Sequence, residues 1–445
     1  MAEARTQSTD RPTSERVPLT PITAERYVSR EYQQLEWQRL WPKVWLLAGA
    51  VQDVSEPGDY FVFELDPESI VVSRTEAGEL RAFYNVCQHR GARVVLSERG
   101  NMARYTCPYH GWVYENDGTL CHVPEAANFS RGVPMQDLSL KQLRIEEWGG
   151  IVWICMDPEA PPLADFLGPV QAMVAPFRMQ DMQMVEDQTV ELDCNWKAVF
   201  DNFGELYHVE HIHPQHETIF DCPMAVNEML PGGHTRVLID GFTVNTRLPI
   251  PDEVPASQWA QLQTLGMNKD DYRGRVLEVR RDVQLKKRQL GESLGYNYDL
   301  LSDEQLSDIV QYNLFPNAIL VLQPDELWIL RSRPHGDDPN RCYWDKLAFR
   351  MMPKVEGTQR ANLSFNLDQD PLPTAQERPE HDQFPHDAII NGEKTMTITL
   401  DQDIHLIRDV QKGMHSRGFR EAWLSDEEER VQYFHSTLDS YMTEG

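Results

Sequence analysis

Long apolar runs are absent from this sequence, and their absence bears on where the protein acts. The first 20 residues contain no apolar stretch of the length that a signal peptide needs, and no later segment approaches a membrane span. The seven cysteines are scattered and odd in number, so they indicate no regular disulfide framework. We therefore expect a protein of a reducing compartment, the cytoplasm, with no membrane partner.

Basic residues are few as well. The 445-residue chain has 42 Lys and Arg against 70 Asp and Glu, which gives a formal net charge of −28. So acidic a chain repels nucleic acids and anionic membranes, and neither is expected as a partner. No GxGxxG motif follows a strand pattern, so the sequence indicates no nicotinamide or flavin site. The 41% of hydrophobic residues and the length predict two or three globular domains.

What the sequence does contain is a dense group of metal-ligand residues that ends at Trp112. Cys87 and His89 are separated by one residue, Cys107 and His110 by two, and seventeen residues lie between the pairs. Two thiolates and two imidazoles on tight loops suit a [2Fe–2S] cluster with one iron held by sulfur and the other by nitrogen. Tetrahedral zinc is the alternative. Zinc fingers usually group Cys with Cys and His with His, so the cluster is the favoured interpretation.

A second group, rich in His, lies at the end of residues 195–216, which we expect to form one long helix. His208 and His213 are five residues apart, so an ideal helix sets them about 140° apart around its axis. They can share a metal only if the helix ends or bends between them. Two His and one carboxylate form the facial triad of mononuclear Fe(II) oxygenases, which leaves positions open for O₂ and substrate. The alternative is a His-rich helix end with capped or solvated imidazoles.

The carboxylate of such a triad must come from another part of the chain, and two identical strings compete. LDQD occurs at 367–370 and again at 400–403. Prolines follow the first string directly, so it cannot lead into a regular helix. The second string begins a helical pattern. This difference favours Asp403 over Asp370 as the third ligand.

The order of the expected elements divides the chain into three parts. Residues 1–34 combine a polar arm with a helix. Residues 35–157 contain short strand patterns between Gly, Pro and charged turns, which predicts a small antiparallel β domain with the Cys/His loops at its hairpin tips. The C-terminal part of this β domain should pack on the domain formed by residues 158–445. Residues 158–445 mix helical and strand patterns, so the fold class is α+β, with a charged helical segment at 256–312.

Both groups of ligands resemble those of one family. CxHRGA followed by CPYHGW is similar to the Rieske signature of ring-hydroxylating non-haem iron oxygenases, and NWK followed by YHxxxxH is similar to their iron site. The resemblance covers roughly residues 35–155 and 160–440. It implies a catalytic α subunit, the terminal oxygenase, whose catalytic domain has a helix-grip antiparallel sheet. The implied cofactor ligands are Cys87, His89, Cys107 and His110 for the [2Fe–2S] cluster, and His208, His213 and Asp403 for Fe(II).

The resemblance also implies how the parts work together. Electrons come from a separate reductase or ferredoxin, and the oxygenase is a head-to-tail homotrimer, with or without a small β subunit. In the trimer, His110 of one subunit reaches Glu205 and His208 of the next. Glu205 stands where many members have Asp, as it does in the branch that acts on quaternary ammonium compounds. Asn202 and Glu205 are expected to act at the site beside the ligands, whereas His211 and His216 are expected as neighbours of the site or as surface residues.

The expected reaction is the mono- or dihydroxylation, or the oxidative demethylation, of a small organic substrate with O₂. An aromatic, polycyclic or terpenoid compound or acid is the favoured substrate, and a betaine-type compound is the alternative. Two rivals belong to other classes: an iron–sulfur sensor and a zinc-stabilised structural module. A sensor has no use for a complete triad, and a zinc protein is colourless where a Rieske protein is red-brown.

Overall fold

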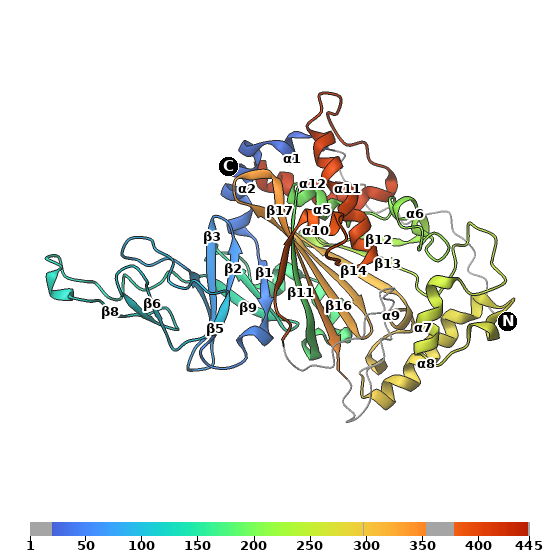
Figure 1. Cartoon of the computed structure of the whole chain (residues 1–445), viewed down its shortest axis with the longest axis horizontal. Coiled ribbons are helices and arrows are strands. Elements are labelled where there is room, and N and C mark those ends of the chain that lie inside the picture. The colour runs from blue at the N-terminus through green and yellow to red at the C-terminus, as the bar shows by residue number, and fades with distance from the viewer. Residues whose placement is uncertain (1–19, 297, 353–377, 444–445) are drawn as a thin grey trace.

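Two β-rich regions lie side by side along the longest axis of the molecule, and helices cover the second of them (Figure 1). The structure is a computed structural model that describes residues 20–296, 298–352 and 378–443. The α+β class and the order of the two regions, with the small β region first, agree with the expectation from the sequence. No helix within these described ranges is both long enough and apolar enough to span a bilayer.

The first region is built from three small antiparallel sheets, with strand orders β4-β3-β2-β5, β6-β7-β8 and β1-β10-β9. Apolar and β-branched runs form its inner strands, because such side chains pack well on a pleated surface. In β3 the run Ile70 to Val72 is fully buried. The strands are β1 (Leu46–Ala50), β2 (Asp59–Leu65), β3 (Glu68–Arg74), β4 (Leu80–Tyr84), β5 (Arg99–Asn101), β6 (Arg104–Thr106), β7 (Val113–Glu115), β8 (Leu120–His122), β9 (Arg144–Trp148) and β10 (Ile151–Cys155).

One large sheet organises the second region. Its strand order is β12-β13-β14-β15-β16-β17-β11-β18, and all neighbours pair antiparallel except β11 and β18, which are parallel. The strands are β11 (Met182–Leu192), β12 (Val226–Met229), β13 (Thr235–Ile239), β14 (Ile309–Leu314), β15 (Ala318–Gln323), β16 (Glu326–His335), β17 (Asp338–Met351) and β18 (Asp382–Pro385). In the described part of the chain after residue 377, β18 is followed directly by helix α10.

Helices from both ends of the chain gather over this sheet. In Figure 1, α5, α10, α11 and α12 lie together above its strands, and α7 and α8 lie at one end of the molecule. The helices are α1 (Glu25–Val28), α2 (Arg30–Arg39), α3 (Leu163–Leu167), α4 (Val170–Val174), α5 (Trp196–Asn202), α6 (Val209–Ile212), α7 (Trp259–Thr264), α8 (Val279–Leu294), α9 (Asp303–Ser307), α10 (His386–Ile390), α11 (Ile398–Met414) and α12 (Glu429–Thr443). Helices α7 to α9 fall in the segment 256–312, where we expected helices.

Helix α11 explains how a carboxylate comes to lie inside the protein. Its buried positions recur at steps of three and four residues, so they form one face. They are Leu400, Asp403, Ile404, Ile407 and Gln411. Asp403 therefore lies on the apolar face that packs inward. Burying its carboxylate costs free energy unless a partner satisfies it.

The single long helix expected over 195–216 is wrong. Helix α5 ends at Asn202, and α6 spans only Val209–Ile212. Gly204 lies in the break, where a Cβ atom would lie 2.7 Å from Val431 Cγ2 of α12. The close approach of α12 thus requires glycine at this position, and glycine itself disfavours a helix. Helix α6 begins directly after His208 and ends directly before His213.

The N-terminal helices are held on the second region by a buried ion pair. Residue 34, where we expected the N-terminal part to end, lies inside α2. From α2, the carboxylate of Glu36 accepts hydrogen bonds from Lys197 Nζ at 2.6 Å and from Trp196 Nε1 at 3.1 Å. Both charged side chains are 0% exposed. Burial raises the pKa of Glu36 and lowers that of Lys197, so each charge depends on the other.

Replacing Glu36 with Leu should therefore destabilise the protein strongly. The change leaves the Lys197 ammonium buried without its counter-charge, which costs about 3–5 kcal/mol in comparable pairs. Chemical denaturation, followed by tryptophan fluorescence, measures the loss. The double variant Glu36→Leu/Lys197→Met is the control and should recover most of it. A single variant as stable as the wild type would contradict the role of the pair.

Candidate metal centres

The Cys/His pairs lie on two loops with the same hydrogen-bond pattern. The loops join β4 to β5 and β6 to β7. In the first, the carbonyl of Cys87 accepts the N–H of Gly91 at 3.0 Å, and in the second the carbonyl of Cys107 accepts the N–H of Gly111 at 3.0 Å. These glycines have φ values of 77° and 69°, which other residues rarely adopt. The two loops thus present their ligand pairs in equivalent turns.

The side chains on these loops are arranged with the sulfurs inside and the imidazoles outside. Cys87 and Cys107 are each 2% exposed, whereas His89 and His110 are half-buried, with ring centroids 4.5 Å apart. Trp112 stacks on His89 at 4.9 Å. Nδ1 of His89 is buried and has no hydrogen-bond partner. Two buried thiols, two adjacent imidazoles and an unsatisfied ring nitrogen fit a [2Fe–2S] cluster with sulfur on the inner iron and nitrogen on the outer one.

Changing His89 or His110 to Cys should keep part of the cluster but shift its visible and EPR spectra. The reduction potential should fall, because His ligation raises the potential of such clusters by hundreds of millivolts relative to all-Cys ferredoxins. Redox titration of the purified variants measures the fall. His122→Cys, on the exposed end of β8, is the matched control and should change neither property. An unaltered spectrum and potential in both loop variants would refute the ligand assignment.

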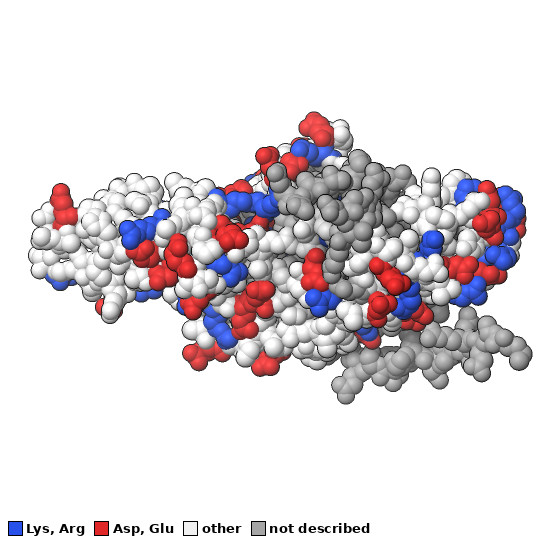
Figure 2. Space-filling model, turned by 90° about the horizontal axis from the view of Figure 1, so that it is seen from below, with Lys and Arg blue, Asp and Glu red and all other residues white. Residues whose placement is uncertain are grey.

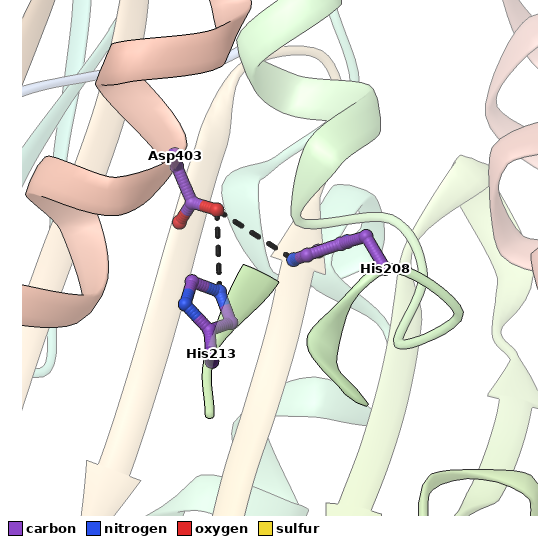
Figure 3. Close-up of side chains that lie close together, drawn as sticks. All are labelled: His208, His213 and Asp403. Atoms are coloured by element: carbon purple, nitrogen blue, oxygen red, sulfur yellow. Dashed lines mark ion pairs between the residues drawn. The ribbon is translucent and has the colours of Figure 1, made fainter. Parts of the chain in front are cut away.

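His208, His213 and Asp403 come together in the second region (Figure 3). The two imidazoles flank the short helix α6, and the carboxylate comes from α11. Asp403 Oδ1 lies 3.3 Å from His213 Nε2 and 3.7 Å from His208 Nε2. One ligand atom from each of the three lies within 4.8 Å of the other two. The break between α5 and α6 makes this possible, because both rings can then turn toward α11.

The opposite ring nitrogen of each His is held by an oxygen. Nδ1 of His208 pairs with Oε1 of Glu205, and Nδ1 of His213 lies 2.7 Å from Oε1 of Gln402. Such partners keep the hydrogen on Nδ1 and leave the Nε2 lone pairs for a metal. Asp403 Oδ1 is buried without a hydrogen-bond partner. Two imidazole nitrogens and an unsatisfied carboxylate oxygen, all facing one point, fit the donor set of a 2-His-1-carboxylate iron site.

Glu205 is not a solvated helix residue, since its side chain is 11% exposed. Its second oxygen, Oε2, accepts the backbone N–H of His208 at 3.1 Å. Burial lowers the pKa of His208, but the hydrogen bond and charge of Glu205 outweigh it, so the pKa is raised overall. Arg430 of α12 is fully buried nearby. Burial lowers its pKa to about 10, and the charge of Glu205 offsets part of the effect.

A cavity of about 140 Å³ opens beside the three ligands. Its wall is mainly apolar and includes the aromatic side chains of Phe203, Phe220 and Trp328, with aliphatic ones such as Leu206, Ile239 and Leu330. Asn202, at the end of α5, lines it too, with Nδ2 buried and without a hydrogen-bond partner. His216 also lies in the wall, so it neighbours the site, while His211 is exposed.

Sequence reasoning missed the residues that support these ligands. Gln402 holds His213, and Gln215 donates from Nε2 to Oε1 of Gln402 at 2.8 Å. The only signal was the position of Gln402 beside Asp403 in the second LDQD string. Asp370, the rival from the first string, lies outside the described residues.

Comparison with known proteins gives matches over both regions. Residues 44–143 match the family model of the Rieske [2Fe–2S] domain, and residues 179–444 match that of the ring hydroxylating alpha subunit, catalytic domain. The glycine betaine monooxygenase oxygenase subunit of Pseudomonas aeruginosa (strain UCBPP-PA14) is 30% identical over 189 residues, 42% of this chain and 44% of that protein. The large oxygenase component of the 2,4-dinitrotoluene dioxygenase system of Burkholderia sp. (strain RASC) is 32% identical over 272 residues, 56% of this chain and 60% of that protein.

The matches thus span about half the length of these curated relatives. Two solved structures have the same fold over nearly the whole chain. The quaternary ammonium Rieske monooxygenase CntA in complex with L-carnitine has a TM-score of 0.66 at 19% identity, and covers 95% of this chain and 96% of its own. Naphthalene 1,2-dioxygenase with indole bound has a TM-score of 0.67 at 19% identity, and covers 97% of this chain and 94% of its own.

Proposed function

Since this chain belongs to the family of ring hydroxylating alpha subunits, with a Rieske [2Fe–2S] domain ahead of the catalytic domain, we propose that it is a terminal oxygenase. It would use O₂ and electrons from a separate reductase or ferredoxin to hydroxylate, or oxidatively demethylate, a small organic substrate. The cluster would be held by Cys87, His89, Cys107 and His110, and the catalytic iron by His208, His213 and Asp403. The scattered cysteines, none of which forms a disulfide, support a cytoplasmic location.

One observation carries this proposal: the two Nε2 atoms and Asp403 Oδ1 face one point at the edge of an apolar cavity. Iron bound there would supply the activation of O₂, a reaction that no protein side chain performs. The protein side chains would orient the metal ligands and exclude water. Glu205 and Gln402 fix the two imidazoles, and the apolar wall keeps water away from the substrate.

The positions of the two proposed metal centres within one subunit support the expected homotrimer. In Figure 1 the cluster loops, next to β5 and β6, lie at one end of the molecule, and α6 and α11 lie well beyond the middle. One subunit therefore separates its two metal centres, and a neighbouring subunit would bring its His110 to Glu205. The surface at the cluster end is mostly uncharged on the face shown in Figure 2. Leu96, Met102 and Tyr109, on the cluster loops or the neighbouring turn after β5, are exposed, which suits docking of a protein partner.

The cavity favours a neutral, apolar substrate such as an aromatic compound. Among the described residues that line it, the carboxylates are Glu205, which pairs with His208, and Asp403, which would be bound to the iron. Trp328, the best face for a quaternary ammonium group, already has Lys346 Nζ 4.8 Å from its ring centroid. The alternative, a betaine-type substrate, has its support in Glu205 and in the relative that is named a glycine betaine monooxygenase oxygenase subunit.

An O₂-uptake screen with a surrogate reductase tests the proposal. The purified, red-brown protein is offered aromatic compounds, polycyclic or terpenoid acids and betaines, and products are identified by mass spectrometry with ¹⁸O₂. Incorporation of ¹⁸O into a compound of the first class is the expected result. Formaldehyde from a betaine would select the alternative. Substrate-independent O₂ consumption without any oxygenated product, across the screen, would count against an oxygenase.

A further inference from the structure

His216 is a polar group in the wall of the substrate cavity, and the metal centre leaves one of its nitrogens unused. The residue is 7% exposed and lines the cavity. Its Nε2 lies 3.2 Å from Oγ1 of Thr399, whereas its Nδ1 is buried with no hydrogen-bond partner. An unpaired buried nitrogen is destabilising, and a ligand that pairs with it removes that cost.

The surroundings of His216 hold its ring in place and suit the tautomer with hydrogen on Nδ1. Phe220 stacks on the imidazole, with centroids 4.7 Å apart and planes at 29°. Oγ1 of Thr399 accepts a hydrogen bond from Gln215 Nε2 at 3.3 Å, so its own hydrogen is available to donate to His216 Nε2. The neutral imidazole then carries its hydrogen on Nδ1. His216 thus offers a fixed N–H donor.

The rest of the cavity defines what this donor would bind. No Lys or Arg belongs to the part of the wall that the structure describes, so an anionic carboxylate would have bound iron as its counter-charge but would be desolvated beside the acidic Glu205 and Asp403, which costs free energy. A neutral acceptor, such as a carbonyl oxygen, avoids that cost. The volume of about 140 Å³ is close to the roughly 150 Å³ of apolar cavities that take up benzene. One aromatic ring with one neutral acceptor fits.

We propose that His216 determines substrate specificity by donating a hydrogen bond from Nδ1 to a neutral carbonyl oxygen on a single-ring substrate. This inference rests on the oxygenase function proposed above and narrows its substrate class. The ring centroids of His213 and His216 are 5.6 Å apart, so a substrate held at Nδ1 stays next to the metal ligands. His216 is then a binding residue that also positions the carbon to be oxidised.

A matched pair of compounds isolates this contact. Acetophenone carries the acceptor, and isopropylbenzene has a similar shape without it. Equilibrium dialysis against the holoenzyme gives a dissociation constant for each. Their ratio is the readout, because a general change in fit affects both compounds and cancels. Three variants complete the set: His216→Phe keeps the ring, His216→Asn keeps a donor near Nδ1, and His216→Gln keeps a donor near Nε2.

The wild type should bind acetophenone roughly tenfold more tightly than isopropylbenzene, as one neutral hydrogen bond allows. The Phe and Gln variants should bind the two compounds equally, and the Asn variant should restore most of the preference. Three results would overturn the proposal: no preference in the wild type, a preference that survives in the Phe variant, or equal rescue by Gln and Asn. Binding needs no turnover, so an intact preference without ¹⁸O incorporation would count against the oxygenase function alone.

Discussion

Asp403→Ala should abolish turnover and leave the Rieske cluster in place. The change removes the carboxylate that faces both Nε2 atoms, so of the three grouped side chains two imidazoles alone would have to hold the iron. Iron analysis should fall from about three to about two atoms per chain, the two that belong to the cluster. The red-brown spectrum should be unchanged, because the cluster ligands lie in the other region of the chain.

Two controls accompany this variant. Asp409→Ala changes an exposed carboxylate on the same helix, one that pairs with Lys412 at the surface, and should keep both iron and activity. Asp370→Ala tests the other LDQD string and should be tolerated. Full activity in Asp403→Ala together with an inactive Asp370→Ala would reverse the choice between the two strings.

Glu205→Gln should slow electron transfer to the catalytic iron while both metal centres stay occupied. The amide still reaches His208, but it has lost the charge that raises the pKa of that imidazole and that would attract His110 of a neighbouring subunit. Changes in such supporting groups typically cost 10- to 100-fold in activity. Single-turnover oxidation of the reduced cluster, with substrate and O₂ present, should slow by about this factor.

Glu205→Asp should retain part of the rate, since it keeps the carboxylate on a shorter side chain. Glu210→Gln is the matched control: it removes a carboxylate from α6 whose partner is Arg247. A Glu205→Gln protein whose cluster oxidises at the wild-type rate, with normal product yield, would rule out the bridge between subunits.

The grouping of the proposed ligands could be predicted from the sequence because it depends on local spacing. Cys87 and His89 occupy one turn of chain, and the equivalent turn at Cys107 repeats the arrangement, so few folds other than paired hairpin loops suit them. Asp403 was predictable for a different reason: the prolines after Asp370 excluded a helix there, while the second string continues a helical pattern into α11.

The supporting residues could not be predicted, since each depends on contacts between distant segments. Gln215 and His216 read as an extension of a His-rich helix, and only the packing of α11 shows that they meet Gln402 and Thr399. The single helix expected over 195–216 failed for a similar reason. The approach of α12 that requires Gly204 leaves no local signal beyond the glycine itself.

Because α6 and α11 meet at the proposed iron ligands, metal occupancy and the docking of these two segments should be thermodynamically linked. His213 and Gln402 are 189 residues apart in sequence, and side-chain contacts around the ligands join their segments. A metal bound to both acts as a reversible cross-link. Its contribution to stability grows with free metal concentration, reaching about 4 kcal/mol at a thousand times the dissociation constant. Chelation should thus speed amide exchange in α11 before the rest of the protein responds.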